Sequence, residues 1–551
     1  MTTVSPTPDP VTADDPDHVF IHRCDPDAVA AELAASTGPL AGLRLAVKDN
    51  TDVAGVPTTA GCPSFAYTPD TSATVIERLV DAGATVVGKT NLDQFATGLV
   101  GTRSPYGVVE SPRAPGRVAG GSSSGSAAAV ALGQADLAIG TDTAGSGRVP
   151  AAFCGVVGIK ATRGWVPNTG TVPACASFDC TTIFAPSVGA AARAILVMAG
   201  PDAADPTSRA RPLDGPHGPV RVVGVPGADV LAACDERTRL GFAGATARAQ
   251  ACGFTVAEVD LGAYLAAGEL LYGGGFVAER HASVGAFIDA GAPDADPTVA
   301  SIIGAAGRIP ATRYAADRLR LATMTAEADR LWERVDAILT PTTPFHPTVA
   351  DVAADPSGVN LALGRFTSGC NLVDWCAVAL PGPDLDDGLP FGVQLLGPAW
   401  ADQVLWQAAA TLLDEEPPAG PDGLVRLAVA GAHLDGQPLN HQLTDRRAVL
   451  EARTTTAPAY RMVAIDGPVA KPGVYRVDPA EGEALEVEVW ALDPAGFGTF
   501  VAEVPPPLAI GTVELADGSE VPGFVCEPRA IDGATDITRF GGWRGWLASR
   551  S

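Results

Sequence analysis

Lysine is scarce in this sequence, and basic residues of both kinds are outnumbered by acidic ones. The 551 residues include 37 lysines and arginines against 63 aspartates and glutamates, which gives a formal net charge of −26. The only lysines are Lys48, Lys89, Lys160 and Lys471. Because such a surface repels phosphates and anionic headgroups, we expect neither nucleic acid nor membrane as a main partner. An anionic substrate would need a local arginine to attract it.

Long apolar runs are missing as well. No stretch approaches the roughly 20 apolar residues that a transmembrane helix requires. The opening stretch MTTVSPTPDPVTADDPDHVF is acidic and rich in proline, without the basic and apolar regions of a signal peptide. We therefore expect a cytoplasmic protein.

The ten cysteines are scattered, and no two of them have the CxxC spacing. The closest pair is Cys175 and Cys180. This pattern argues against a disulfide framework or a zinc site and is typical of reduced thiols. We expect neither a metal nor a cofactor.

Strand and helix signals alternate along most of the chain. LRLAV and TVVG indicate strands, while 25–36, 72–84 and 124–133 indicate helices, the second of them capped by Thr71 or Ser72. Such alternation predicts an α/β sandwich.

The pattern changes after EEPPAGPDG at 415–423, which has the composition of a linker. The segments that follow indicate short strands separated by Gly, Pro and Asp: YRMVAI, ALEVEVWAL, TFVAEV and GTVELADGSEVPGFVCE. We therefore expect two domains, a large one at 1–420 and a small β-rich one at 424–551.

Two familiar motifs occur in the wrong structural context. Residues 83–90 match the P-loop pattern, but a helix precedes them and ATVV is itself a strand, whereas a P-loop links a strand to a helix. Residues 121–125 match G-x-S-x-G, but no strand precedes them, and the downstream His281 and His346 have no recognisable setting. We expect neither ATP binding nor a serine–histidine–aspartate triad.

Three other segments form one pattern: AVKDN with Lys48, GGSSSGSAAAVALG with Ser122, and GTDTAGSGRVPAAFCG with Ser146. A serine that attacks an amide needs a base within hydrogen-bond reach. Neutral lysine can be that base if its pKa of about 10.4 falls by about three units, and burial causes such a shift.

This pattern resembles the amidase signature family, over a region from about 40 to 398. The resemblance implies a large α/β sandwich with a mixed central sheet. It also implies that Ser146 is the nucleophile, that Ser122 is the middle member on a cis peptide bond, and that Lys48 is the base. The loop of small residues before the nucleophile offers consecutive backbone N–H groups for the oxyanion, from Thr143, Ala144 and Gly145.

Most members of that family have GGS at the nucleophile, where this sequence has AGS. The variant, with the segments at 87–107 and 172–180 and several after residue 430, resembles the allophanate hydrolase subfamily. The resemblance implies hydrolysis of the terminal amide of allophanate (urea-1-carboxylate) to ammonia and carbon dioxide in urea degradation. It also implies substrate binding by Tyr272 and Arg280, since a guanidinium suits a planar carboxylate. Gly273–Gly275 make one continuous helix between them doubtful.

The subfamily reaction leaves N-carboxycarbamate, which loses carbon dioxide with help from the C-terminal domain. His433 is our candidate there, with Asn440, His441 and Tyr460 nearby in sequence, although a lone histidine in a β-rich domain is more often structural. A biotin-dependent urea carboxylase would have to supply the substrate from another protein. The subfamily also suggests a homodimer.

Three alternatives remain open. A general small-amide, malonamide-type amidase would not need Tyr272 and Arg280. The glutaminase subunit of a tRNA-dependent amidotransferase would need a tRNA-binding partner, and the acidic surface and additional β-rich domain argue against it. A non-catalytic scaffold would dock the carboxylase, and co-purification would reveal it.

Overall fold

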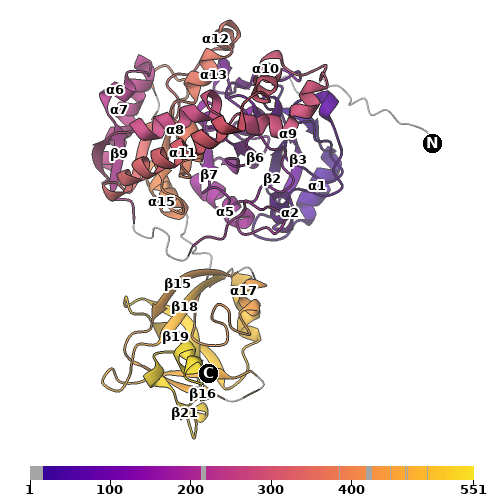
Figure 1. Cartoon of the computed structure of the whole chain (residues 1–551). Coiled ribbons are helices and arrows are strands. Elements are labelled where there is room, and N and C mark those ends of the chain that lie inside the picture. Colours follow the sequence, from indigo (N-terminus) through magenta and orange to yellow (C-terminus); the bar gives the residue numbers. More distant parts are fainter. Residues whose placement is uncertain are drawn as a thin grey trace, which may run out of the picture. The chain divides into compact units, whose positions relative to one another are not determined.

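The computed structural model describes residues 17–212, 219–383, 385–416, 425–446, 448–465, 467, 469–492 and 494–550. The chain divides into two compact units, one from 1–211 and 215–418, the other from 212–214 and 419–551 (Figure 1). The expected N-terminal arm as far as residue 16, and the expected linker from residue 417 onward, lie outside the described residues.

A single large sheet runs through the first unit. Its eleven strands among the described residues have the order β1-β3-β2-β6-β8-β7-β12-β13-β11-β9-β10. Parallel pairs (β2 with β3 and β6, β9 with β10 and β11) occur beside antiparallel ones, so the sheet is mixed, as expected. The strands are β1 (Phe20–Arg23), β2 (Arg44–Lys48), β3 (Thr85–Thr90), β6 (Leu137–Asp142), β7 (Val157–Lys160), β8 (Cys180–Ala185), β9 (Val222–Pro226), β10 (Thr255–Val259), β11 (Ala337–Pro341), β12 (Cys376–Pro381) and β13 (Gly392–Gly397), with a separate hairpin β4 (Glu110–Ser111) and β5 (Ala114–Val118).

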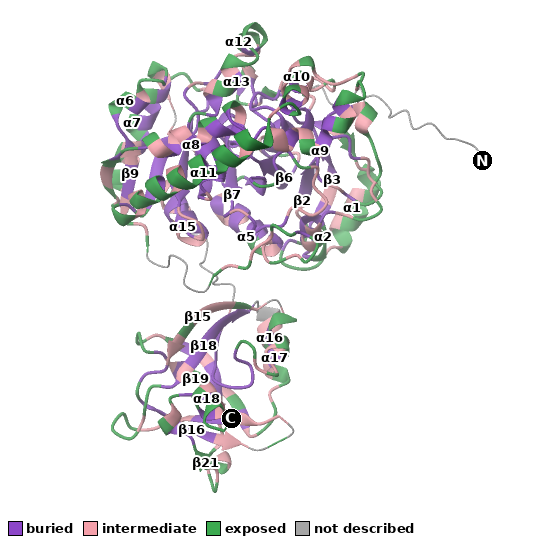
Figure 2. Ribbon diagram, in the orientation of Figure 1, coloured by how far each residue is buried: buried purple, intermediate pink, exposed green. Residues whose placement is uncertain are grey.

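Helices cover both faces of this sheet. Leu45 and Val47 of β2 pack on one face and Ala46 on the other, because successive side chains of a strand point to opposite faces. Helices α2, α5, α7 and α15 cover the first face, and α3, α4, α8 and α14 the second. The strands are buried between these layers in Figure 2, which confirms the α/β sandwich.

The helices of the first unit are α1 (Pro26–Ala35), α2 (Thr74–Asp81), α3 (Ser124–Ala131), α4 (Val149–Cys154), α5 (Val188–Met198), α6 (Ala228–Leu231), α7 (Glu236–Ala251), α8 (Gly262–Gly273), α9 (Ala278–Asp289), α10 (Pro297–Ala306), α11 (Ala311–Ala328), α12 (Val349–Ala354), α13 (Gly358–Leu363), α14 (Ser368–Leu372) and α15 (Asp402–Leu412). The three predicted helices correspond to α1, α2 and α3. Residues 85–90 form β3, which agrees with the rejection of a P-loop.

The predicted cap of α2 is wrong. The residue before the helix is Ala73, and no side chain caps it. The Ser72 hydroxyl instead accepts a hydrogen bond from the backbone N–H of Ala54, at 2.9 Å. A tertiary contact with a neighbouring loop has replaced the local capping bond.

The second unit is rich in strands, as expected. A five-stranded sheet has the order β15-β18-β14-β20-β19, and a three-stranded sheet has the order β17-β16-β21. The strands are β14 (Val425–Val429), β15 (Val449–Thr455), β16 (Tyr460–Ile465), β17 (Lys471–Arg476), β18 (Glu486–Leu492), β19 (Leu508–Glu514), β20 (Glu520–Cys526) and β21 (Thr535–Asp536), with helices α16 (His441–Thr444), α17 (Pro494–Ala502) and α18 (Trp543–Ala548).

One of the predicted strands is wrong, because most of TFVAEV lies in helix α17. Phe500 is buried, and Phe497 and Val504 pack against the same core. Phe497, Phe500 and Val504 are three and four positions apart, which places them on one face of a helix. The apolar positions of TFVAEV therefore fit a helix as well as a strand. Proline is favoured at the first position of a helix, and α17 begins at Pro494.

All ten cysteines are free thiols, which agrees with the expected absence of a disulfide framework. Among the described residues, no helix has both the length and the apolar character needed to cross a membrane.

Candidate active site

Lys48 lies at the end of β2 and is fully buried. Its Nζ donates hydrogen bonds to Ser122 Oγ and Thr141 Oγ1, both at 2.7 Å. Both partners are neutral hydroxyls, so no carboxylate in the described part of the chain contacts the ammonium to compensate its desolvation. Burial lowers the pKa of Lys48 to about 7, even though the carboxylates of Asp93, Asp142 and Asp179 act in the opposite direction.

The other two lysines of the first unit are also fully buried but have different partners. Lys89 Nζ lies 3.2 Å from the Asp49 carboxylate. Lys160 Nζ donates to the carbonyl of Ala161 at 3.0 Å and to Cys180 Sγ at 3.6 Å. Lys48 is thus the one whose hydrogen-bond partners are both serine or threonine hydroxyls.

Ser122 follows a cis peptide bond from Gly121, as the family resemblance implied. Its carbonyl accepts from the backbone N–H of Asp93. The Asp93 carboxylate in turn accepts from the backbone N–H groups of Val100, Gly101 and Arg103. Asp93 therefore folds the loop after β3 around the serine loop, a role that the sequence pattern did not reveal.

The nucleophile loop is organised around the Asp142 carboxylate. Asp142 accepts from the backbone N–H groups of Gly145 and Gly147, at 2.8 and 3.0 Å. The N–H of Gly145, one of the predicted oxyanion donors, therefore donates to Asp142 here. Among the described residues, the N–H groups of Ala144 and Ser146 have no hydrogen-bond acceptor. Only glycine suits position 145, since its φ is +127° and a Cβ would meet Thr367 Oγ1 at 2.3 Å.

Arg148 pairs with this same aspartate, and both side chains are fully buried. Its Nε and one terminal nitrogen each lie 2.9 Å from an Asp142 oxygen, and the guanidinium also donates to Gln394, Asn371 and the Thr367 carbonyl. Burial alone would raise the pKa of Asp142, but the charge and hydrogen bonds of Arg148, together with the charge of Lys160 and the Gly147 N–H, hold that pKa below its ordinary value. Arg148 thus stabilises the nucleophile loop. Because its charge is neutralised by Asp142, it is not available to bind an anionic ligand.

Arg280 is equally buried, at 2% exposed, but it has no carboxylate partner within ion-pair distance in the described part of the chain. Its terminal nitrogens donate to Thr97 Oγ1 at 2.8 Å, to the Ala96 carbonyl at 3.2 Å and to the Tyr272 hydroxyl at 3.0 Å. Its Nε has no partner. Helix α8 ends at Gly273 and α9 begins at Ala278, so the doubted continuous helix is indeed interrupted, yet Tyr272 and Arg280 meet.

The loop from Ala96 to Gly98 connects Arg280 with the predicted nucleophile. Arg280 binds Ala96 and Thr97, while Ser146 Oγ donates to the Gly98 carbonyl at 3.4 Å. No hydrogen bond joins Ser146 to Ser122 among the described contacts, so the Ser146 hydroxyl is turned toward Gly98 here. His281 and His346 contact Asp289 and the Val118 carbonyl respectively, which agrees with the rejection of a histidine triad.

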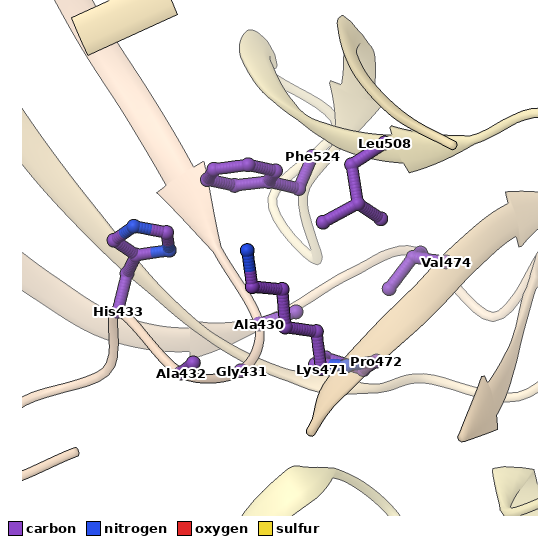
Figure 3. A pocket seen from close by; sticks show the side chains of 9 residues that line it. All are labelled: Ala430, Gly431, Ala432, His433, Lys471, Pro472, Val474, Leu508 and Phe524. Atoms are coloured by element: carbon purple, nitrogen blue, oxygen red, sulfur yellow. The ribbon is translucent and has the colours of Figure 1, made fainter. Parts of the chain in front are cut away.

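A separate pocket lies within the second unit. A cavity of about 310 Å³ is lined by His433, Leu439, Gln442, Val469, Lys471, Phe500, Glu503, Val504, Pro505, Leu508 and Phe524. In the adjoining part of the pocket (Figure 3), the Lys471 amine points toward the rings of His433 and Phe524. The His433 ring stacks on Phe524, and its Nε2 lies 2.8 Å from Gln442 Oε1. Burial, more than any other effect, lowers the pKa of His433.

The buried Asp142–Arg148 pair generates a prediction for stability. Replacing Arg148 with Met should destabilise the first unit by about 3–5 kcal/mol, because it leaves an unpaired carboxylate in the interior. Arg44→Met is the matched control, since its pair with Asp136 is about one-third exposed and should be worth about 1 kcal/mol or less. Urea denaturation measures both changes. Equal losses would show that burial does not determine the value of these pairs.

Comparison with known proteins follows the division into two units. Residues 18–406 match the Amidase family, and residues 425–548 match the family described as allophanate hydrolase C-terminal domain. The chain is 36% identical over 412 residues to a glutamyl-tRNA(Gln) amidotransferase subunit of Haloarcula marismortui, covering 69% of this chain and 96% of that protein.

Two relatives cover nearly the whole chain. Urea amidolyase of Saccharomyces cerevisiae is 40% identical over 548 residues, 93% of this chain but only 30% of the length of that protein. The structure of Kluyveromyces lactis allophanate hydrolase is 35% identical, with a TM-score of 0.70, over 97% of this chain and 94% of that one. The chain therefore belongs to the amidase family of hydrolases that act on amide C–N bonds, and it has the domain architecture of an allophanate hydrolase.

Proposed function

We propose that this protein hydrolyses the terminal amide of allophanate, with Ser146 as nucleophile, Ser122 as proton relay and Lys48 as base. The observation that carries the substrate assignment is the charge of Arg280. It is a buried guanidinium without a carboxylate partner in the described chain, and it reaches the loop that Ser146 also touches. A buried charge is costly unless something pairs with it, so an anionic substrate is the natural partner.

The proposed first step follows from the protonation state of Lys48. With a pKa of about 7, a large fraction of Lys48 is neutral near neutral pH and can accept a proton. Substrate binding turns the Ser146 hydroxyl from Gly98 toward Ser122, which passes the Ser146 proton to Lys48 as Ser146 Oγ attacks the terminal carbonyl. The free N–H groups of Ala144 and Ser146 are suited to stabilise the oxyanion.

The same groups act in reverse to complete the hydrolysis. Lys48, now protonated, returns a proton through Ser122 to the leaving nitrogen of the tetrahedral intermediate. Its C–N bond then breaks, which releases ammonia and leaves the acyl-enzyme. Water then attacks the ester, again deprotonated through Ser122 and Lys48, and releases N-carboxycarbamate. In the bound substrate, the carboxylate would accept from the Arg280 Nε–H and the Tyr272 hydroxyl, which places the reacting amide at the far end of the molecule.

We assign loss of carbon dioxide from N-carboxycarbamate to the second unit. Two features of its pocket support this assignment. Lys471 has no acceptor or carboxylate partner among the residues described there, and Glu503, which lines the same cavity, pairs with Arg446. Lys471 is therefore available to a dianion, and the largely neutral His433 beside it can move a proton.

The proposed substrate also implies a supplier. Allophanate is carboxylated urea, so an enzyme that carboxylates urea must precede this step. The chain spans 30% of the length of the yeast urea amidolyase that it resembles. We propose that a biotin-dependent carboxylase supplies the allophanate. We also propose a homodimer on the basis of the subfamily resemblance.

A substrate panel tests the assignment. Ammonia release from allophanate, malonamide, acetamide and glutamine should be strong for allophanate alone and lost in Ser146→Ala. Arg280→Gln should raise KM for allophanate about a hundredfold, since losing one partner of a buried charge pair costs about 2–5 kcal/mol. Arg308→Gln, at an exposed arginine, is the control and should leave KM unchanged. Comparable activity on neutral amides in both arginine variants would make the protein a general amidase.

The pKa of Lys48 predicts the pH profile. Lysine accepts a proton only when neutral, so kcat/KM should rise about tenfold per pH unit below about pH 7 and level off above it. Lys48→Arg should be inactive throughout, because its guanidinium stays protonated. Initial rates between about pH 6 and 9 measure both. A wild-type profile that still rises near pH 9 would mean that Lys48 retains an ordinary pKa.

The second unit predicts that the two steps can be separated. His433→Ala and Lys471→Met should release the first ammonia at the wild-type rate, while N-carboxycarbamate accumulates before carbon dioxide appears. Following ¹³C-labelled allophanate by NMR resolves the intermediate. Carbon dioxide appearing at the same rate in wild type and variants would assign the second step to spontaneous chemistry.

A further inference from the structure

The segment from Pro173 to Asp179, here called the connecting segment, joins the two functional ends of the candidate site. It lies directly before β8 in the sequence, and no catalytic or substrate-binding role has been assigned to it so far. One end contacts the nucleophile loop, and the other contacts the helix that carries Arg280.

Asp179 anchors the connecting segment to the nucleophile loop. Its Oδ1 accepts from the Thr143 hydroxyl at 2.5 Å, and its oxygens also accept from the backbone N–H groups of Ala174 and Cys175 at 2.8 and 3.1 Å. The carboxylate is 6% exposed, so water does not compete for these bonds. Thr143 precedes Ala144, whose N–H has no acceptor, so the bond to Asp179 orients the peptide in front of the nucleophile.

A second set of contacts anchors the same segment to the region of Arg280. The Glu279 carboxylate accepts from the Ser177 N–H at 2.9 Å, and Ser283 Oγ donates to the Pro173 carbonyl at 2.7 Å. The rings of Phe178 and Phe276 meet edge to face, with centroids 4.9 Å apart. Glu279 is the neighbour of Arg280 in α9, so these contacts fix the helix beside the substrate-binding guanidinium.

We infer that Asp179 is a positioning residue and that the connecting segment sets the separation between Ser146 and Arg280. Both ends of the substrate are thereby held by one rigid element. Allophanate would have to reach both Ser146 and Arg280 at once, so the spacing role rests in part on the proposed function. The orientation of the nucleophile loop by Asp179 does not depend on the identity of the substrate.

Steady-state kinetics on the full-length protein test the first anchor. Thr143→Val keeps the shape but loses the hydroxyl, and Asp179→Asn loses the charge. Each should lower kcat at least tenfold with KM changed less than twofold, and the double variant should be no worse than either single one. Thr143→Ser keeps the hydroxyl and should retain kcat within threefold of wild type.

The buried pair of Thr162 and Asp402 is the matched control. The Thr162 hydroxyl donates to Asp402 at 2.6 Å, and Asp402 also accepts a backbone N–H, so the bonding resembles that of Thr143 and Asp179. Thr162→Val should lower the melting temperature without the kcat loss. An equal loss of kcat in this control, or full activity in folded Thr143→Val, overturns the positioning role.

Glu279→Met tests the second anchor. It should raise KM for allophanate at least fivefold while kcat stays within twofold, because the binding end shifts and the nucleophile loop does not. An unchanged KM overturns the spacing role. If the wild-type protein prefers another amide, the proposed substrate fails, but the kcat comparison on that amide still decides the role of Asp179.

Discussion

The chemistry of this site depends on burying one ammonium group without a carboxylate beside it. Lys48 ends an interior strand of the sheet, under the serine loop, and within the described residues its Nζ donates hydrogen bonds to two hydroxyls and to no carboxylate. Removing the charge from water favours the neutral amine, and a neutral amine is the form that can act as a base. The sheet supplies the burial, and the small residues of α3 allow the serine loop to approach the lysine closely.

Some buried cations of the first unit pair with a carboxylate, whereas others, Lys160 among them, have only uncharged hydrogen-bond partners among the described residues. Arg148 is held by Asp142, and Lys89 by Asp49, and each of these pairs is satisfied within the protein. Arg280 and Lys48 are buried without such a partner, and both lie at the candidate site. The protein thus buries two cationic side chains near the predicted nucleophile without a carboxylate partner. Such an arrangement is typical of a functional site, where the bound substrate can supply the missing negative charge.

The second unit follows the same principle on a smaller scale. Its single lysine, Lys471, lines a cavity together with His433 and two phenylalanines. The acidic residue of that cavity, Glu503, forms an ion pair with Arg446. Both units therefore present a cation to a ligand, which suits a first product that carries one more negative charge than the substrate.

The sequence by itself predicted Lys48, Ser122 and Ser146 as the candidate site residues, because they lie in motifs whose letters are specific. It determined the α/β and β-rich character of the two parts through the alternation of short patterns. Tertiary structure decided what those residues can do. The low pKa of Lys48 comes from burial by segments that are distant in the sequence. The hydrogen bond from Gly145 to Asp142 depends on the conformation of the nucleophile loop. The hydrogen bonds that Asp93 and Asp179 accept are visible only in the folded chain. The cap of α2 and the helix α17 differed from expectation for the same reason, since local patterns there fit two outcomes and contacts from residues far along the chain selected one.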